Sequence, residues 1–165
     1  MATSTQSVVD PKRELLRHAV ATVSYRGGKT LRDAPAEFAD FRLGDTSRTP
    51  VQILAHIGDL YDWALSIALG NQTWNDATPL NWNDEVSRFY AALKAFDDYL
   101  ASGQPLHGDA EALFQGPIAD SLTHIGQLAM LRRIAGSKMM GENYYRADIV
   151  VGRVGAAQTA PKKEF

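Results

Sequence analysis

The chain has 165 residues, of which 45% are apolar and 22% are charged. This length is enough for one hydrophobic core and short for two, so we expect a single globular domain over residues 1–165. The 17 basic and 19 acidic residues give a formal net charge of −2. This balance provides no general attraction for nucleic acid or an anionic membrane, and neither is expected as a partner.

The sequence contains no cysteine, which excludes disulfides, thiolate zinc sites and cysteine nucleophiles. Any metal ligands must therefore be histidines and carboxylates. The first ten residues have no basic region followed by an apolar run, and no stretch reaches the roughly 18 consecutive apolar residues that a membrane span needs. We expect a cytoplasmic protein.

The first helix signal is Asp10-Pro11, where Asp can cap free N–H groups and Pro suits the first helical position. Apolar residues then recur at helical spacing, and Gly27-Gly28 is expected to end the helix. The polar connection that follows has about twenty residues, longer than a usual loop between bundle helices, so we expect it to cross the bundle. One helical turn is predicted within it, from Pro35 to Phe41.

Three further helices are predicted from the same kinds of signal. Their bounds are Thr49-Pro50 to Gly70, Asn81 or Asn83 to about Leu100, and Gly116-Pro117 to Gly136. No segment between them alternates convincingly as a strand does. The pattern predicts an all-α four-helix bundle over residues 10–136, with a long crossover between the first and second helices.

Residues 137–165 are rich in apolar side chains but have no helical period. Such a segment is too apolar for a free tail, so we expect an irregular segment packed on the bundle, as a lid or as the contact of a homodimer. If it caps the open end of the bundle, Glu142 is a candidate base or fourth metal ligand and Arg146 a candidate anion contact. Packing at the surface is the commoner role for such loop residues.

His56 lies in the middle of the apolar stripe of the predicted second helix. Burying its imidazole costs free energy unless the ring has a partner, which is either a neighbouring hydroxyl or carbonyl or a metal ion. The nearby Asp59 and Asp62 turn towards the polar side of the helix, and we expect both to be exposed to solvent.

Asp120 and His124 are four residues apart in the predicted fourth helix, so their side chains share one face, which Gln127 continues. The pair alone is weak evidence, because a simple hydrogen-bonded Asp and His have the same spacing. Together with His56 it gives two histidines and one carboxylate. This ligand set suits zinc, nickel or ferrous iron with open coordination positions.

The run from Asp120 to Gly136 resembles the last helix of the DinB/YfiT-like family, whose members often have His-x-x-x-His-x-Gly-Gln at this point. The segment from Ile53 to Trp63 resembles the second helix of that family, which supplies its remaining histidine. The resemblance covers residues 10–136 and implies a four-helix bundle with a long crossover and a metal-dependent enzyme. Related proteins are thiol-dependent transferases or isomerases. Asp120 departs from the pattern, because the family has a histidine there.

The leading expectation is an enzyme that binds a divalent metal through His56, Asp120 and His124 and acts on a small-molecule substrate. It would be a hydrolase if the metal activates water, or a transferase or isomerase if it activates an exogenous low-molecular-weight thiol. The alternatives are a metal-free small-ligand-binding or stress-response module, and a dimeric scaffold whose interface is the C-terminal segment.

Overall fold

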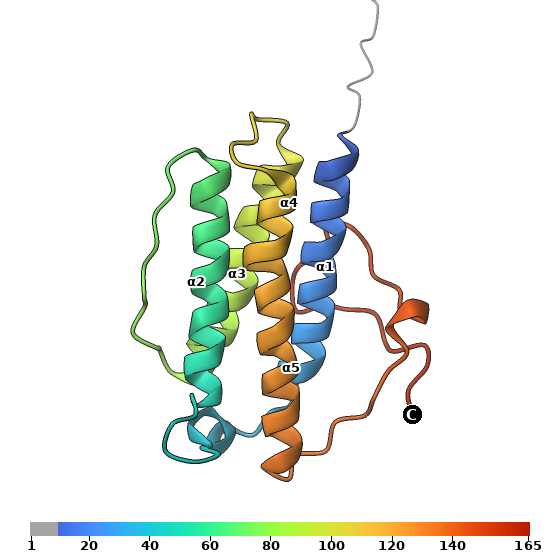
Figure 1. The fold of residues 1–165 in the computed structure, drawn as a ribbon. Coiled ribbons are helices and arrows are strands. Elements are labelled where there is room, and N and C mark those ends of the chain that lie inside the picture. The colour runs from blue at the N-terminus through green and yellow to red at the C-terminus, as the bar shows by residue number, and fades with distance from the viewer. Residues whose placement is uncertain (1–9) are drawn as a thin grey trace, which may run out of the picture.

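The computed structural model describes residues 10–165, and this part of the chain is helical and contains no strand. Three long helices and a fourth, composite helical run lie side by side (Figure 1). Their bounds are α1 Pro11–Leu31, α2 Pro50–Ala68, α3 Trp82–Ala101 and the run of α4 Ala110–Leu113, η2 Phe114–Ile118 and α5 Ala119–Ile134. The predicted all-α class is confirmed.

The predicted starts of the first three helices are confirmed by their caps. The Asp10 carboxylate accepts a hydrogen bond from the Lys12 N–H at 2.9 Å. Thr49 and Gln52 form a reciprocal capping box at the start of α2. The Asn81 side chain accepts from the Asp84 N–H at 3.1 Å. Each cap satisfies N–H groups that have no partner within the helix itself.

The predicted end of the first helix at Gly27-Gly28 is wrong, because α1 continues to Leu31. A Cβ atom at Gly27 would lie 2.6 Å from the ring of Phe89, and one at Gly28 would lie 2.8 Å from the Tyr90 hydroxyl. These two glycines therefore allow α3 to approach α1 closely. They serve packing between helices and do not terminate one.

The predicted start of the fourth helix at Gly116-Pro117 is also wrong, because helical structure begins at Ala110. Pro117 lies inside the run, in a π-helical turn over Phe114–Ile118. A wider turn accommodates a residue that has no N–H and whose ring clashes with the preceding turn of an α-helix. The Ser121 hydroxyl donates to the carbonyls of Pro117 and Ile118 just beyond it.

The connections differ from the expected crossover. The segment 32–49, which contains the predicted turn as η1 (Ala36–Asp40), stays at one end of the helices (Figure 1). The segment 69–81 instead runs along α2 from one end to the other, because α2 and α3 point in the same direction. It is held there by bonds from the Thr73 N–H to Ser66 Oγ and from the Ala77 N–H to Asp59 Oδ2. The long connection thus joins α2 and α3.

Residues 137–165 form no long helix and pack beside α1 (Figure 1). Val154 is buried in the core, and the Gln158 amide bonds to Ser24 of α1 at 3.3 Å. The core itself is formed by buried apolar side chains from all the long helices, among them Val20, Ile57, Leu93, Phe96 and Leu128. Over residues 10–165, none of the helices combines the length and the apolar character needed to cross a bilayer.

Candidate metal centre

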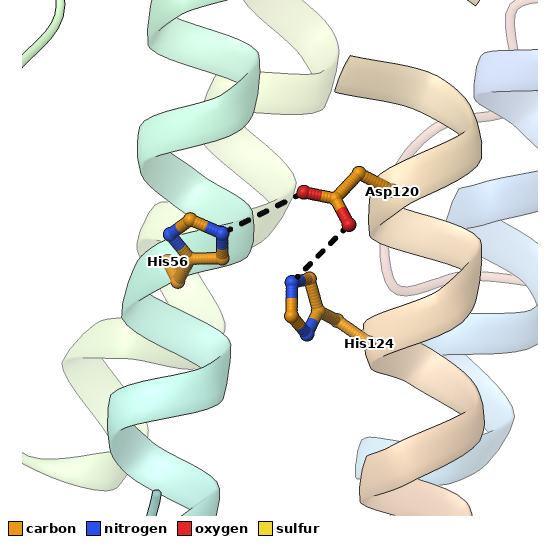
Figure 2. Close-up of side chains that lie close together, drawn as sticks. All are labelled: His56, Asp120 and His124. Atoms are coloured by element: carbon orange, nitrogen blue, oxygen red, sulfur yellow. Dashed lines mark ion pairs between the residues drawn. The ribbon is translucent and has the colours of Figure 1, made fainter. Parts of the chain in front are cut away.

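His56 of α2 meets Asp120 and His124 of α5 between the two helices (Figure 2). His56 Nε2 lies 3.7 Å from Asp120 Oδ2, and His124 Nε2 lies 3.4 Å from Asp120 Oδ1. One potential ligand atom from each residue falls within 4.8 Å of the other two. The structure therefore brings together all three residues that the sequence predicts as metal ligands.

Gln127, one turn after His124, sets the orientation of the His124 ring. His124 Nδ1 is 2.9 Å from Gln127 Oε1. Because an amide oxygen only accepts hydrogen bonds, Nδ1 carries the proton in this contact. In the neutral ring, Nε2 then presents its lone pair to the centre of the group, as in many metal-binding histidines.

The His56 side chain is 19% exposed and lies beside two other rings. Its ring centroid lies 5.7 Å from that of Trp74, in the 69–81 connection, and 4.8 Å from that of His124. Burial lowers the pKa of His56, and the neighbouring His124 and Arg48 add to this effect against the opposing influence of Asp120. A lowered pKa favours the neutral imidazole, which is the form that binds a metal.

Two of the separations in the group are close to those expected around a metal ion. Two ligands about 2.1 Å from a tetrahedral ion lie roughly 3.4 Å apart. The two imidazole-to-carboxylate distances, 3.4 and 3.7 Å, are close to this spacing, although they run to different oxygens of Asp120. Two histidines and a carboxylate also form the donor set that zinc, nickel and ferrous iron accept. The donor types therefore suit such an ion, and the three donor atoms, which lie within 4.8 Å of one another, would have to move closer together to bind it.

The group is accessible from three surface pockets, each touching one of its residues. A pocket of about 450 Å³ includes His124, one of about 360 Å³ includes Asp120, and one of about 230 Å³ includes His56. Asp120 is the most exposed of the three, with 45% of its side chain accessible. Open access from several sides suits a site that exchanges small molecules, since structural metal sites are closed.

Arg48 lines both the pocket of His124 and that of His56. The sequence analysis did not single it out. Because Arg48 directly precedes the Thr49-Pro50 helix start, the sequence places it at the beginning of α2. The proximity of Arg48 to α5 could not be predicted, because it depends on how α2 and α5 pack.

Asp59 does not have the predicted exposure. Its carboxylate is 5% exposed and bonds to Arg88 of α3 at 2.5 Å. Arg88 also reaches Asp62, whose side chain is 55% exposed as predicted. Arg88 passes close over Gly58, where a Cβ would lie 3.0 Å from the guanidinium. A small residue in α2 thus permits an ion pair that the helix periodicity alone does not reveal.

Glu142 and Arg146 are not placed with the metal group, which corrects their expected position. The buried Glu142 carboxylate accepts from the Tyr25 hydroxyl at 2.6 Å and from Lys29 Nζ at 2.8 Å, both on α1. Arg146 is exposed in η3 (Tyr144–Arg146). The C-terminal segment packs beside α1, whereas the metal group lies between α2 and α5 (Figures 1 and 2). Glu142 is therefore not a fourth ligand in this arrangement.

No family model, curated protein or solved structure matches this chain. The resemblance to the DinB/YfiT-like family therefore stays a prediction from the sequence, and no comparison supports it.

Proposed function

We propose that the protein binds a divalent metal ion, zinc, nickel or iron, through His56, Asp120 and His124, and that it is a metal-dependent enzyme acting on a small molecule. The observation that carries this proposal is the convergence of three ligand atoms from two helices within 4.8 Å of one another. The lowered pKa of His56 and the hydrogen bond from His124 to Gln127 support it, because both favour rings with a free lone pair.

The residues have distinct roles in this proposal. His56 and His124 bind the ion as neutral ligands, and Asp120 contributes the negative charge. Gln127 holds the His124 ring in the orientation that binding needs. The ion would activate a bound water, giving a hydrolase, or an exogenous low-molecular-weight thiol, giving a transferase or isomerase.

The proposed family is the DinB/YfiT-like one, and the proposed architecture is its four-helix bundle in a single domain. The all-α class and the position of the histidines on the second and last long helices support this assignment. An aspartate replaces one histidine of the family pattern, but its carboxylate remains a competent ligand. A cytoplasmic location and a homodimer belong to the same proposal.

The activity is tested with protein loaded with zinc, nickel or ferrous iron and with the same protein after chelation. The substrates are a nitrophenyl ester for hydrolysis, and an electrophile with cysteine or glutathione for thiol transfer. We expect turnover only with metal, and its loss in His124→Ala. His18→Ala is the matched control, because His18 is an exposed histidine on α1 outside the group. Turnover that is equal in chelated protein or in His124→Ala contradicts a metal-dependent reaction.

A further inference from the structure

The pocket of about 450 Å³ beside His124 lies between α5 and the segment that leads into α2. Its walls are largely apolar, with Ile53 and Leu131 buried in the core and Met130 half exposed at the rim. This size lies in the range of small-molecule sites, which combine apolar walls with a few polar groups that set orientation.

Arg48 supplies the positive charge of this pocket. Over residues 10–165, its guanidinium makes no ion pair, whereas Arg17, Arg88 and Arg13 each pair with a carboxylate. The Arg48 side chain is exposed, and the backbone on both sides of it is held by hydrogen bonds. Ser47 accepts from the Leu43 N–H and donates to the Gly44 carbonyl, and Thr49 belongs to the capping box of α2.

An unpaired guanidinium beside an apolar wall matches a ligand with a carboxylate and an apolar chain. Arg is the side chain best suited to a carboxylate, because its planar donors bind both oxygens. The same pocket contains His124 and Gln127, so a ligand bound there lies next to the candidate metal group. Arg48 also lines the pocket that includes His56.

We propose that this pocket binds a small monocarboxylate, with Arg48 at the carboxylate and Ile53, Met130 and Leu131 along its apolar chain. This inference deepens the proposed function, on which it rests, by naming the substrate class. The anion is bound by Arg48 and not by the metal, so its recognition is separable from metal binding.

The test is a titration followed by ¹H–¹⁵N NMR of the full chain, with sodium hexanoate as the probe. Hexan-1-ol and hexylammonium have the same chain length with a neutral and a cationic head. We expect hexanoate to bind most tightly and to shift the amide signals of Ser47, Gln127 and Leu131. Arg48→Gln weakens hexanoate binding about tenfold and leaves hexanol unchanged, as expected for loss of one charge-assisted contact.

The control variant is Arg133→Gln, which makes the same change of charge on an exposed arginine of α5 outside the pocket. Equal binding of hexanoate and hexanol, or an equal loss in Arg48→Gln and Arg133→Gln, overturns the proposal.

Metal dependence separates this inference from the proposed function, so the titration is repeated with chelated and metal-loaded protein. Binding that needs Arg48 in both forms supports the inference. Hexanoate binding that needs metal and is unchanged in Arg48→Gln overturns it and leaves the metal site standing. Binding that needs Arg48 in a protein that takes up no metal supports the anion site and overturns the proposed function.

Discussion

His124 Nε2 lies 3.4 Å from Asp120 Oδ1, one helical turn earlier on α5, while its other ring nitrogen bonds to Gln127 one turn later. A single face of one helix thus supplies a carboxylate, an imidazole and the group that orients the imidazole. His56 faces them from α2. In this account, α5 provides most of the site and α2 completes it.

The role of Gln127 is tested by removing its oxygen. Gln127→Leu is expected to lower metal affinity by roughly 10- to 100-fold, the usual effect of losing a partner that orients a metal ligand. Competition with a chromophoric chelator measures this affinity. Gln127→Glu retains an acceptor for His124 Nδ1 and should keep tight binding. Because Gln127 is exposed, neither variant should change the free energy of unfolding much. Equal metal affinity in all three proteins would contradict the orienting role.

The buried ion pair between Asp59 and Arg88 is expected to matter for stability. Asp59→Ala removes a carboxylate that is only 5% exposed. Arg88 then loses this buried partner and keeps its contact with the more exposed Asp62. We expect a loss of about 2 kcal/mol in the free energy of unfolding. Asp62→Ala removes an exposed partner of the same arginine and should cost about 0.5 kcal/mol or less. Urea denaturation compares the two variants, and equal losses would show that burial of Asp59 is unimportant.

Gly27 provides a test of the packing between α1 and α3. In Gly27→Ala the new Cβ would lie 2.6 Å from Phe89, so we expect a loss of about 1–3 kcal/mol from overpacking. Gly126→Ala is the matched control in α5, where nothing lies within 4 Å of a Cβ. That variant should gain up to about 1 kcal/mol from helix propensity. Thermal unfolding measures the stability of both variants. A stabilised Gly27→Ala protein would contradict the close approach of α1 and α3.

The contact between Tyr25 and Glu142 predicts a loss of stability at high pH. Burial, followed by the hydrogen bond to Glu142, raises the pKa of Tyr25 above its ordinary value of 10.0. The unfolded chain therefore loses this proton at a lower pH than the folded chain. The contribution to stability is fully present below pH 10 and falls as the pH rises towards the folded pKa.

Urea unfolding between about pH 8 and pH 11 measures this effect, since it brackets the unfolded pKa. Tyr25→Phe should be less stable at the lower pH and should lose less stability on going to the higher one. Burial also raises the pKa values of Tyr61 and Tyr90. Against the lowering effect of burial, hydrogen bonds to Glu142 and Glu164 raise the pKa of Lys29, so these three groups contribute to the loss that remains. An identical pH dependence in the wild type and Tyr25→Phe would contradict the assignment to Tyr25.

The starts of the first three helices and the candidate ligand set could be predicted because both depend on local patterns. A cap residue acts on the turn that follows it, as at Asp10 and Thr49. Asp120 and His124 share a face through helical spacing alone, and the apolar stripe places His56 towards a neighbouring helix. The hypothesis that these two faces meet combined His56 with the Asp120 and His124 pair, and the family resemblance implies the same arrangement.

Apart from the start of the fourth helix, the errors concern contacts between residues far apart in the sequence. Gly27 was expected to end a helix because local rules do not include the ring of Phe89 that lies against it. Glu142 was expected near the helix ends, but its partners on α1 are more than 100 residues earlier in the chain. Arg48 was missed because its pocket forms only when α5 packs beside the start of α2.

The most direct test of the account is the metal content of protein purified without an immobilised-metal column or chelator, measured by elemental mass spectrometry. The account predicts about one equivalent of zinc, nickel or iron per chain, retained in His18→Ala and lost in His124→Ala while the helical circular dichroism of both variants is preserved. A protein that contains no metal and takes up no added ion would contradict it. Asp120 would then simply pair with the two histidines.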